Sequence, residues 1–249
     1  MTEPVRIFIG SSSNGEDATI EIAYEHSLRK HLSDKASLDI TWMRQSHDGN
    51  SPWGCWSTQS WSTPFSGFRW AIPEVCGFEG RAIYTDCDMI NMRDISELLK
   101  IDMQGKPVAA RRGTRFGGHE FCVMVFDCAM FKQHSVPVSR MKPDPESHRR
   151  MITKFSGKNN LVADLDPRWN CLDGEDRAIG DMWQLHFTNM ATQPWKPSWY
   201  SGSIHAHPRP DVVQAYHQWY AEAKEAGYDD TALLEAQSKY LHKYNIIGR

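Results

Sequence analysis

The chain has 249 residues, of which 24% are charged, and a formal net charge of −3. This length is enough for one large domain or two small ones with a substantial core. The slightly negative charge argues against a nucleic-acid partner, and the short basic cluster from Arg111 to Arg115 does not change that conclusion. A single basic site in such a chain can still bind phosphates.

The six cysteines form neither a C-x-x-C pair nor the dense pattern of a disulfide scaffold. They indicate reduced thiols and therefore a cytoplasmic protein. Residues 1–10 lack the basic start and long apolar run of a signal peptide, and no stretch approaches 18 apolar residues. The sequence therefore predicts no membrane span and at most peripheral contact with the inner face of a membrane.

The chain begins with a predicted strand, a polar loop and a helix. Residues 5–10 (VRIFIG) form an apolar run that ends in the small, polar stretch SSSNGED. Apolar residues then recur at helical spacing from Ile20 to Leu32, with acidic residues before them and basic residues at their end, as the helix dipole favours. Residues 38–43 (LDITWM) predict a second strand.

The remaining elements continue this alternation. We expect a loop at 45–64, a helix at 65–76 ended by Gly80, strands at 81–85, 106–110, 121–127 and 182–188, a short helix at 94–100, a weak helix at 148–155, and C-terminal helices at 211–226 and 230–244. Strands that alternate with helices predict an α/β fold with a mainly parallel central sheet. Ligands of such sheets bind beyond the carboxyl ends of the strands.

Two aspartates stand at one of those ends, in the D-x-D motif of Asp86 and Asp88. If the strand continues through the motif, alternation brings both carboxylates to the same side. Two oxygen donors with room for phosphate and water suit Mg²⁺ or Mn²⁺. The alternative is an exposed turn with two solvated acids, because D-x-D is short and common.

The flanks of the motif resemble glycosyltransferase family 8. The stretch AIYTDCDMINMRDISELL (residues 82–99) is similar to the D-x-D segment of that family. Four other segments resemble its landmarks in the same order, over roughly residues 5–200: FSGFRWAIPEVCGFEG before the motif, then HEFCVMVFD, PRWNCLD and LHFTNMATQPW. The last of these is similar to the closing H-x-x-G-x-x-K-P-W element.

This resemblance implies a GT-A fold, with a Rossmann-like, mainly parallel sheet flanked by helices and with C-terminal helices. It implies a single domain over 1–249, in which about 5–200 form the core and 208–249 a helical extension. The implied activity moves a sugar from a nucleotide donor, a UDP-sugar by family analogy, to a saccharide or glycolipid acceptor with retention of configuration.

The resemblance also implies the metal ligands. Asp86, Asp88 and His186 match the family residues that bind a divalent metal, Mn²⁺ or Mg²⁺. Such a metal neutralises the charge that develops on the departing nucleoside diphosphate, and a neutral histidine nitrogen is a good ligand for Mn²⁺. Taken alone, His186 would be interpreted as an ordinary, partly buried histidine.

Further residues are expected to contact the donor. These are Gly10, Ser11, Ser12, Arg69, Cys87, Asn189 and Lys196. Small residues in the first loop allow close backbone approach, and Arg69 matches a donor-binding arginine, with a structural ion pair as the alternative. Asn189 stands where the family pattern has glycine, and Gln193 stands where it has the phosphate-binding lysine. Lys196 is the substitute that we expect, and a solvated surface lysine is the alternative.

The sequence specifies the catalytic side chain and the acceptor site less closely than it specifies the metal ligands. Glu120 and Asp173 are, with Arg69, the candidates for catalysis, because a carboxylate can stabilise positive charge on the sugar. Basic residues around the weakly periodic stretch 132–165 are expected to contact the acceptor or an anionic membrane surface: Arg111, Arg112, Arg115, Lys142, Arg149 and Arg150. A sugar nucleotidyltransferase, a D-x-D phosphatase and a non-catalytic sugar-binding protein remain alternatives.

Overall fold

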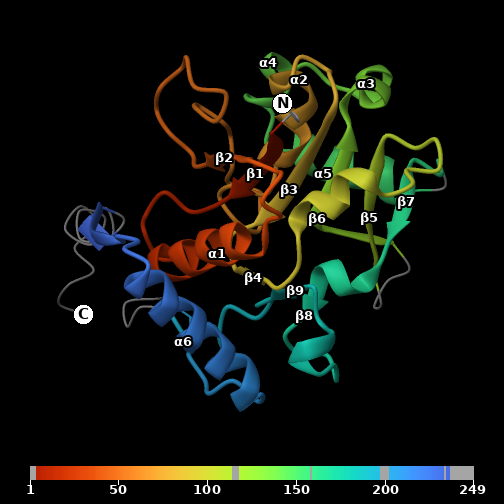
Figure 1. Ribbon diagram of the computed structural model, residues 1–249. Coiled ribbons are helices and arrows are strands. Elements are labelled where there is room, and N and C mark those ends of the chain that lie inside the picture. The colour runs from red at the N-terminus through yellow and green to blue at the C-terminus, as the bar shows by residue number, and fades with distance from the viewer. Residues whose placement is uncertain (1–3, 114–117, 158, 197–201, 233, 236–249) are drawn as a thin grey trace. The chain divides into compact units, whose positions relative to one another are not determined.

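The computed structural model describes residues 4–113, 118–157, 159–196, 202–232 and 234–235 (Figure 1). The chain forms two compact units, which are described separately. Unit 1 comprises residues 1–12, 33–86 and 95–167, and unit 2 comprises residues 13–32, 87–94 and 168–249. The single domain expected over residues 1–249 stays a prediction. Among the described residues, no helix is both long and apolar enough to cross a lipid bilayer.

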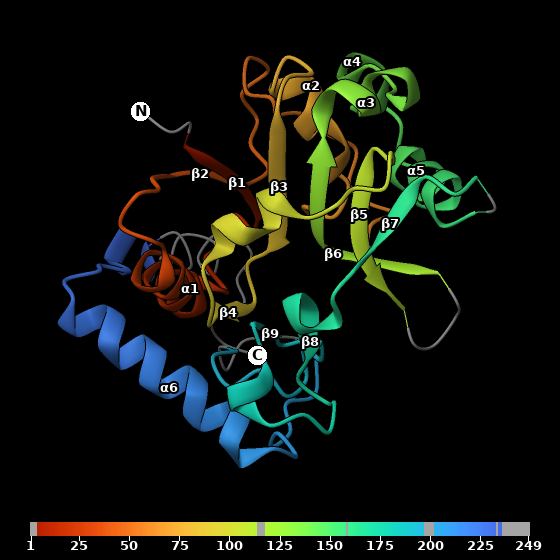
Figure 2. The same cartoon turned by 45° about the vertical axis from the view of Figure 1, so that its right-hand side comes forward.

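Unit 1 contains a six-stranded sheet in the order β2-β1-β3-β6-β5-β7. Its strands are β1 (Val5–Gly10), β2 (Leu38–Met43), β3 (Arg81–Asp86), β5 (Val108–Arg112), β6 (His119–Asp127) and β7 (Val162–Leu165). β6 is antiparallel to both of its neighbours, whereas the other pairs are parallel. Five strands therefore run in one direction, which confirms the mainly parallel α/β fold. Figure 2 shows β3, β6, β5 and β7 side by side.

The helices of unit 1 are short. They are α2 (Ile72–Val75), α3 (Cys128–Phe131), α4 (Val138–Met141) and α5 (Ser147–Ser156), with 3₁₀ turns at Phe68–Ala71, Ile95–Lys100 and Lys132–His134 and a further turn, Pro167–Asn170, that leads into unit 2. α5 is anchored by Phe155, whose ring stacks on Trp70 at 5.2 Å and on Phe131 at 5.3 Å between centroids. Buried aromatic rings of this size contribute strongly to packing.

Unit 2 has a small sheet and two long helices. The sheet has the order β4-β9-β8, with β4 (Met89–Asn91), β9 (Gln184–His186) and β8 (Cys171–Leu172), and a 3₁₀ turn at Ile179–Asp181. The helices are α1 (Ala18–His31) and α6 (Pro210–Glu225). Their apolar faces share one core with β9, which includes Ile20, Leu185 and Val212. The Tyr216 hydroxyl of α6 also donates to Thr19 Oγ1 of α1 at 2.8 Å.

The helix expected at 65–76 is instead a 3₁₀ turn followed by the single turn of α2. It ends at Cys76, because Gly77 takes a φ of +65° that a continuing helix does not allow. Gly80 was therefore the wrong terminator, and it comes directly before β3 instead. The segment expected as a helix at 94–100 is also 3₁₀.

Other predicted elements need smaller changes. The strand expected at 182–188 shortens to β9 and joins the sheet of unit 2. β7 was missed, because its four residues are too few to show a period. α6 ends as predicted before Gly227, which has a φ of +86°. Most of the second C-terminal helix expected at 230–244 lies outside the described residues.

Candidate functional site

The D-x-D motif stands at the point where the chain leaves the sheet of unit 1. β3 ends at Asp86, Cys87 and Asp88 form a bend, and β4 of unit 2 begins at Met89. The strand does not continue through the motif, so the condition under which alternation would bring both carboxylates to the same side is not met. Each aspartate is described below with its own unit.

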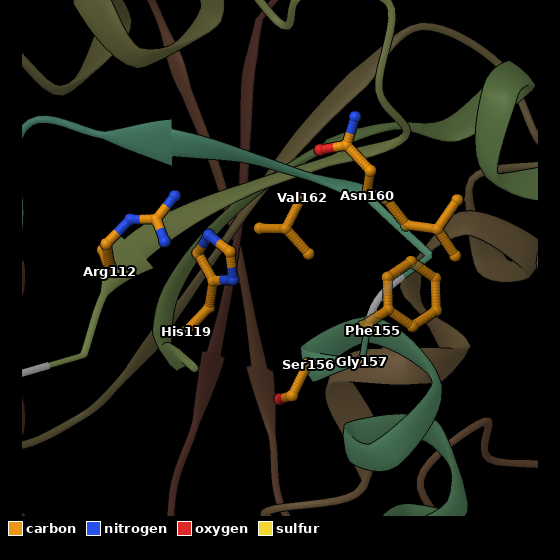
Figure 3. Close-up of a pocket in the computed structure, with 8 residues that line it drawn as sticks. Arg112, His119, Phe155, Ser156, Gly157, Asn160 and Val162 are labelled. Carbon is orange, nitrogen blue, oxygen red and sulfur yellow. The ribbon is translucent and has the colours of Figure 1, made fainter. Parts of the chain in front are cut away.

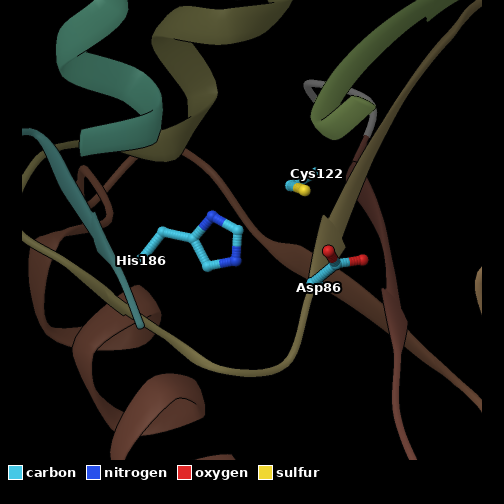
Figure 4. A group of neighbouring side chains, drawn as sticks. All are labelled: Asp86, Cys122 and His186. Atoms are coloured by element: carbon cyan, nitrogen blue, oxygen red, sulfur yellow. The ribbon is translucent and has the colours of Figure 1, made fainter. Parts of the chain in front are cut away.

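Asp86 is held by two side chains of unit 1. Arg69 Nη2 lies 3.1 Å from Asp86 Oδ1, and the Tyr84 hydroxyl donates to the same oxygen. The guanidinium also donates to the carbonyl of Ser66 at 2.7 Å and to the carbonyl of Phe121, and it lies 4.4 Å from the centre of the Tyr84 ring. Figure 4 shows Asp86 on β3 and Cys122 on β6.

The charges of this cluster are well defined at neutral pH. Burial alone would lower the pKa of Arg69, but Tyr84 and Asp86 outweigh it and the pKa is raised. Burial raises the pKa of Tyr84 well above its ordinary value, so its hydroxyl remains a donor. With Asp86, Arg69 forms a structural ion pair, which was the alternative to a contact with the nucleotide-sugar donor.

Asp88 is held by a different set of groups, all in unit 2. The Gln193 side-chain amide donates to Asp88 Oδ2 at 3.0 Å and to the Phe187 carbonyl at 2.7 Å. The Phe187 N–H donates back to the backbone carbonyl of Asp88 at 2.9 Å. Gln193, which stands in place of the family lysine, thus positions the second aspartate, a role that the sequence did not reveal.

His186 ends β9 and is 4% exposed. Its Nδ1 lies 2.8 Å from Asn170 Oδ1, and its Nε2 lies 3.4 Å from Asp88 Oδ1 (Figure 4 shows His186 on its strand). Because an amide oxygen only accepts, the Asn170 contact places the imidazole proton on Nδ1. In the neutral ring, the lone pair of Nε2 then faces a carboxylate oxygen. Two acceptors in this arrangement favour a cation, which is either a proton or a metal ion.

Lys196 is a buried partner of the α1 N-terminus. Its Nζ lies 3.0 Å from Asp17 Oδ1 and 3.8 Å from Glu16, and its side chain is 3% exposed. Burial would lower the pKa of Lys196, but Asp17 and Glu16 raise it overall. Trp195 Nε1 donates to the same oxygen of Asp17 at 2.9 Å. The alternative of a solvated surface lysine is wrong.

The first loop of unit 1 is packed against protein. A Cβ on Gly10 would lie 2.6 Å from Phe65 Cδ2 and 2.9 Å from the Tyr84 hydroxyl. The missing side chain therefore makes room for Phe65 and Tyr84. Ser11 and Ser12 are buried, and Ser11 N donates to the Met43 carbonyl at 3.2 Å.

Two further expected donor contacts differ in exposure. Cys87 is buried, whereas Asn189 is exposed, and the Asn189 side chain accepts from Ala191 N at 3.1 Å.

The two candidate carboxylates for catalysis differ in their surroundings. Glu120 lies on β6 with its Oε2 3.7 Å from Arg111 Nε, and its side chain is 25% exposed. Asp173 is buried in unit 2, where Oδ1 accepts from the N–H and hydroxyl of Thr188 and Oδ2 lies 3.1 Å from His207 Nε2. Both oxygens of Asp173 thus hold protein groups together.

A cavity of about 200 Å³ lies beside the ends of β5 and β6 in unit 1 (Figure 3). It is lined by Arg112, His119, Phe155, Ser156, Gly157, Asn160, Leu161 and Val162. Arg112 and His119 both contact Asp164, at 2.8 and 3.0 Å. Their hydrogen bonds lower the pKa of Asp164, so this carboxylate is ionised at neutral pH.

No protein-family model and no curated protein matches the sequence. Solved structures do match. The bifunctional glycosyltransferase WbbM aligns with a TM-score of 0.61 and 12% identity over 90% of this chain and 52% of its own. The glycosyltransferase GlyE of Streptococcus pneumoniae TIGR4 aligns with a TM-score of 0.61 and 14% identity over 98% of this chain and 64% of its own. The chain has the GT-A-like fold of these glycosyltransferases.

The galactosyltransferase LgtC, solved with donor and acceptor sugar analogs, shares this glycosyltransferase fold, with a TM-score of 0.53 and 9% identity over 86% of this chain and 96% of its own. At such identities the likeness establishes the fold alone. The chain spans 52% and 64% of the lengths of WbbM and GlyE. Membership of family 8 stays a prediction.

Proposed function

We propose that this chain is a metal-dependent glycosyltransferase. It transfers a sugar from a nucleotide donor, a UDP-sugar by family analogy, to a saccharide or glycolipid acceptor with retention of configuration, in the cytoplasm or at the inner face of a membrane. One observation carries the proposal: on a fold shared with glycosyltransferases, His186 Nε2 and the Asp88 carboxylate face each other at 3.4 Å.

The donor set fits a divalent metal. A carboxylate and a neutral imidazole are suitable ligands for Mn²⁺ and acceptable ones for Mg²⁺. We propose Asp88 and His186 as ligands together with Asp86, from which only Cys87 separates Asp88 in the chain. When bound, the metal neutralises the negative charge that develops on the leaving diphosphate.

Surrounding residues hold these ligands in place. Asn170 fixes the tautomer of His186, and Gln193 binds Oδ2 of Asp88 while Oδ1 faces the imidazole. Such outer contacts orient ligands and typically change metal affinity by about 10- to 100-fold when removed. Arg69 has the same positioning role for Asp86.

The remaining donor contacts are proposed for the first loop (Gly10, Ser11 and Ser12) and for Cys87, Asn189 and Lys196. Lys196 acts by fixing Asp17 at the N-terminus of α1, whose N–H groups favour anions. Of the two carboxylates proposed to stabilise the sugar's positive charge, Glu120 is favoured over Asp173, because both oxygens of Asp173 already accept from protein groups.

For the acceptor, we propose the cavity lined by Arg112, His119 and Asn160. Its lining supports this proposal, because the polar side chains of Arg112, His119 and Asn160 surround it and Arg112 ends β5. Arg149 and Arg150 are weaker candidates, because Glu146 and Asp144 already pair with them.

The test uses the full chain with a panel of nucleotide sugars and measures donor hydrolysis and thermal stabilisation, with and without Mn²⁺. UDP with Mn²⁺ should stabilise the protein most, by mass-action linkage. Asp88→Asn should abolish this stabilisation and reduce hydrolysis by about 100-fold or more. The matched control is Asp181→Asn, at an exposed aspartate of the same unit, which should behave as the parent chain does.

Normal hydrolysis by Asp88→Asn in the presence of a chelator would contradict the metal site. A preference for CMP or GDP would contradict the donor. Release of pyrophosphate or of inorganic phosphate would favour the nucleotidyltransferase or the phosphatase, and sugar binding without any product would favour the non-catalytic protein.

A further inference from the structure

Two cysteines of unit 1 meet at the start of β3, the end of that strand opposite Asp86. Cys76 directly follows α2, and Cys128 begins α3 directly after β6. The Cys128 N–H donates to the Gly80 carbonyl at 3.0 Å, which ties the start of α3 to the turn before β3. The Glu79 N–H also donates to the Cys76 carbonyl at 3.2 Å, so one short turn, residues 76–80, contacts both cysteines, and the Cys128 thiol lies close enough to Cys76 to change its pKa.

An arginine lies beside this pair. Arg6 of β1 donates to the Glu79 carbonyl at 2.5 Å and to the Arg81 carbonyl at 3.1 Å, and its charge lowers the pKa of Cys76. Together with Pro4, Glu79 and Gly80 it lines a cavity of about 270 Å³. Cys76 is partly exposed and Cys128 is buried, so small solutes reach the first sulfur before the second.

The surroundings make the two sulfurs chemically unequal. The hydrogen bond from Cys128 lowers the pKa of Cys76, burial opposes this, Arg6 lowers it further, and Asp39 opposes it. The same hydrogen bond, together with burial, raises the pKa of Cys128. Because the thiolate is the nucleophile, Cys76 is the reactive sulfur and Cys128 stays a thiol close to it.

We propose that Cys76 and Cys128 form a redox-active dithiol that a peroxide converts into an intramolecular disulfide. The Cys76 thiolate attacks one oxygen of hydrogen peroxide and breaks the O–O bond. That oxygen stays on Cys76 as a sulfenic acid, and the other leaves as water after taking a proton. The Cys128 sulfur then attacks the Cys76 sulfur and releases the second water.

The balance of the two steps is complete. Two thiols lose two electrons and two protons, and one peroxide becomes two waters. A low-molecular-weight thiol such as glutathione reverses the change by exchange. The site does not depend on the proposed glycosyl transfer, because it lies at the strand end opposite Asp86.

The first experiment treats the reduced chain with hydrogen peroxide, counts thiols after denaturation and maps the peptides by mass spectrometry. The parent chain should lose two of its six thiols and yield one linked peptide pair that contains Cys76 and Cys128. Cys128→Ser should stop at a sulfenic acid on Cys76 that dimedone traps. Cys122→Ser is the matched control and should still form the link.

The second experiment measures the pH dependence of alkylation of each cysteine, normalised to its own rate at high pH so that differences in exposure cancel. The midpoint for Cys76 should lie below that of the exposed Cys55. Cys128→Ala removes the hydrogen-bond donor to Cys76 and should raise the alkylation midpoint of Cys76. Cys128→Ser keeps a hydrogen-bond donor at that position and should raise the midpoint less. Absence of the linked peptide, or a Cys76 midpoint no lower than that of Cys55, would overturn the proposal.

Discussion

The buried Arg69 and the half-buried Asp86 form an ion pair in which Nη2 lies 3.1 Å from Oδ1 and the two side chains are 7% and 13% exposed. The first aspartate of the D-x-D motif therefore already has a cationic partner in the protein. Asp88 has instead a histidine whose lone pair faces it. Asp88 is for this reason the more informative position at which to test metal binding.

The Arg69–Asp86 pair should be important for stability. Arg69→Met leaves the half-buried Asp86 carboxylate without its cation, and we expect the free energy of unfolding to fall by about 3 kcal/mol. Urea denaturation measures the change. The control is Arg149→Met, at a side chain that is 80% exposed, which should change stability by less than about 0.5 kcal/mol. Equal effects of the two substitutions would contradict the structural role of Arg69.

Gly10→Ala should destabilise unit 1 through overpacking. The added methyl group would lie 2.6 Å from Phe65 Cδ2, and we expect a loss of about 1–3 kcal/mol. Gly49→Ala is the control, because nothing lies within 4 Å of the position of its Cβ. Thermal and urea unfolding of the two variants give the comparison, and a neutral Gly10→Ala would show that the ring of Phe65 is free to move aside.

His148 should make the protein less stable in acid. Burial, with a contribution from the charge of Arg69, lowers the pKa of His148 from 6.5 to about 3. Its Nδ1 accepts a hydrogen bond from Trp70 Nε1 at 3.0 Å. Between these two pKa values the unfolded chain binds more protons, so stability is complete above pH 6.5 and falls as the pH decreases, by at most about 5 kcal/mol.

His148→Gln keeps an acceptor for Trp70 but does not titrate, so its unfolding free energy should fall less steeply between pH 6.5 and 4. His205→Gln, at an exposed histidine, should keep the slope of the parent chain. Parallel slopes for the parent chain and His148→Gln would show that His148 is already accessible to protons in the folded state.

Asp173 should couple energetically to His207. Since His207 Nδ1 accepts from Arg209 N at 3.0 Å, its Nε2–H donates to Asp173. Asp173→Asn turns an amide N–H toward that donor or breaks the contacts to Thr188, at a cost of about 1–3 kcal/mol. A double-mutant cycle with His207→Ala tests the contact, and strictly additive losses would rule out a direct interaction.

Apart from β7, the strands of unit 1 were predictable because they are short apolar runs. β1 and β3 carry Ile7, Ile9 and Ile83, which are completely buried, and such runs identify central strands without any tertiary information. The segment that contains Arg69 was less predictable. The apolar spacing at 65–76 predicts an α-helix, but the structure has a 3₁₀ turn at Phe68–Ala71, and the turn at Gly77 decides where the helix ends.

The candidate site was predictable only as a set of residue types. Sequence patterns singled out Asp86, Asp88 and His186, but not the residues that hold them. Gln193 and Asp88 are far apart in the chain, and no local period connects them. Lys196 also shows this limit, because its burial depends on Asp17 of a distant helix.

The position of β3 between β1 and β6 has a consequence for synthesis on the ribosome. β1 and β2 precede β3 in the chain, but β6, its other partner, follows it. Translation of residues 87–127 at roughly 5–20 residues per second takes about 2–8 s. During that time one edge of β3 has no strand to pair with, although its residues Ala82, Ile83 and Tyr84 are completely buried in the folded protein. Open apolar edges attract other chains, so the nascent protein should depend on chaperones in this interval.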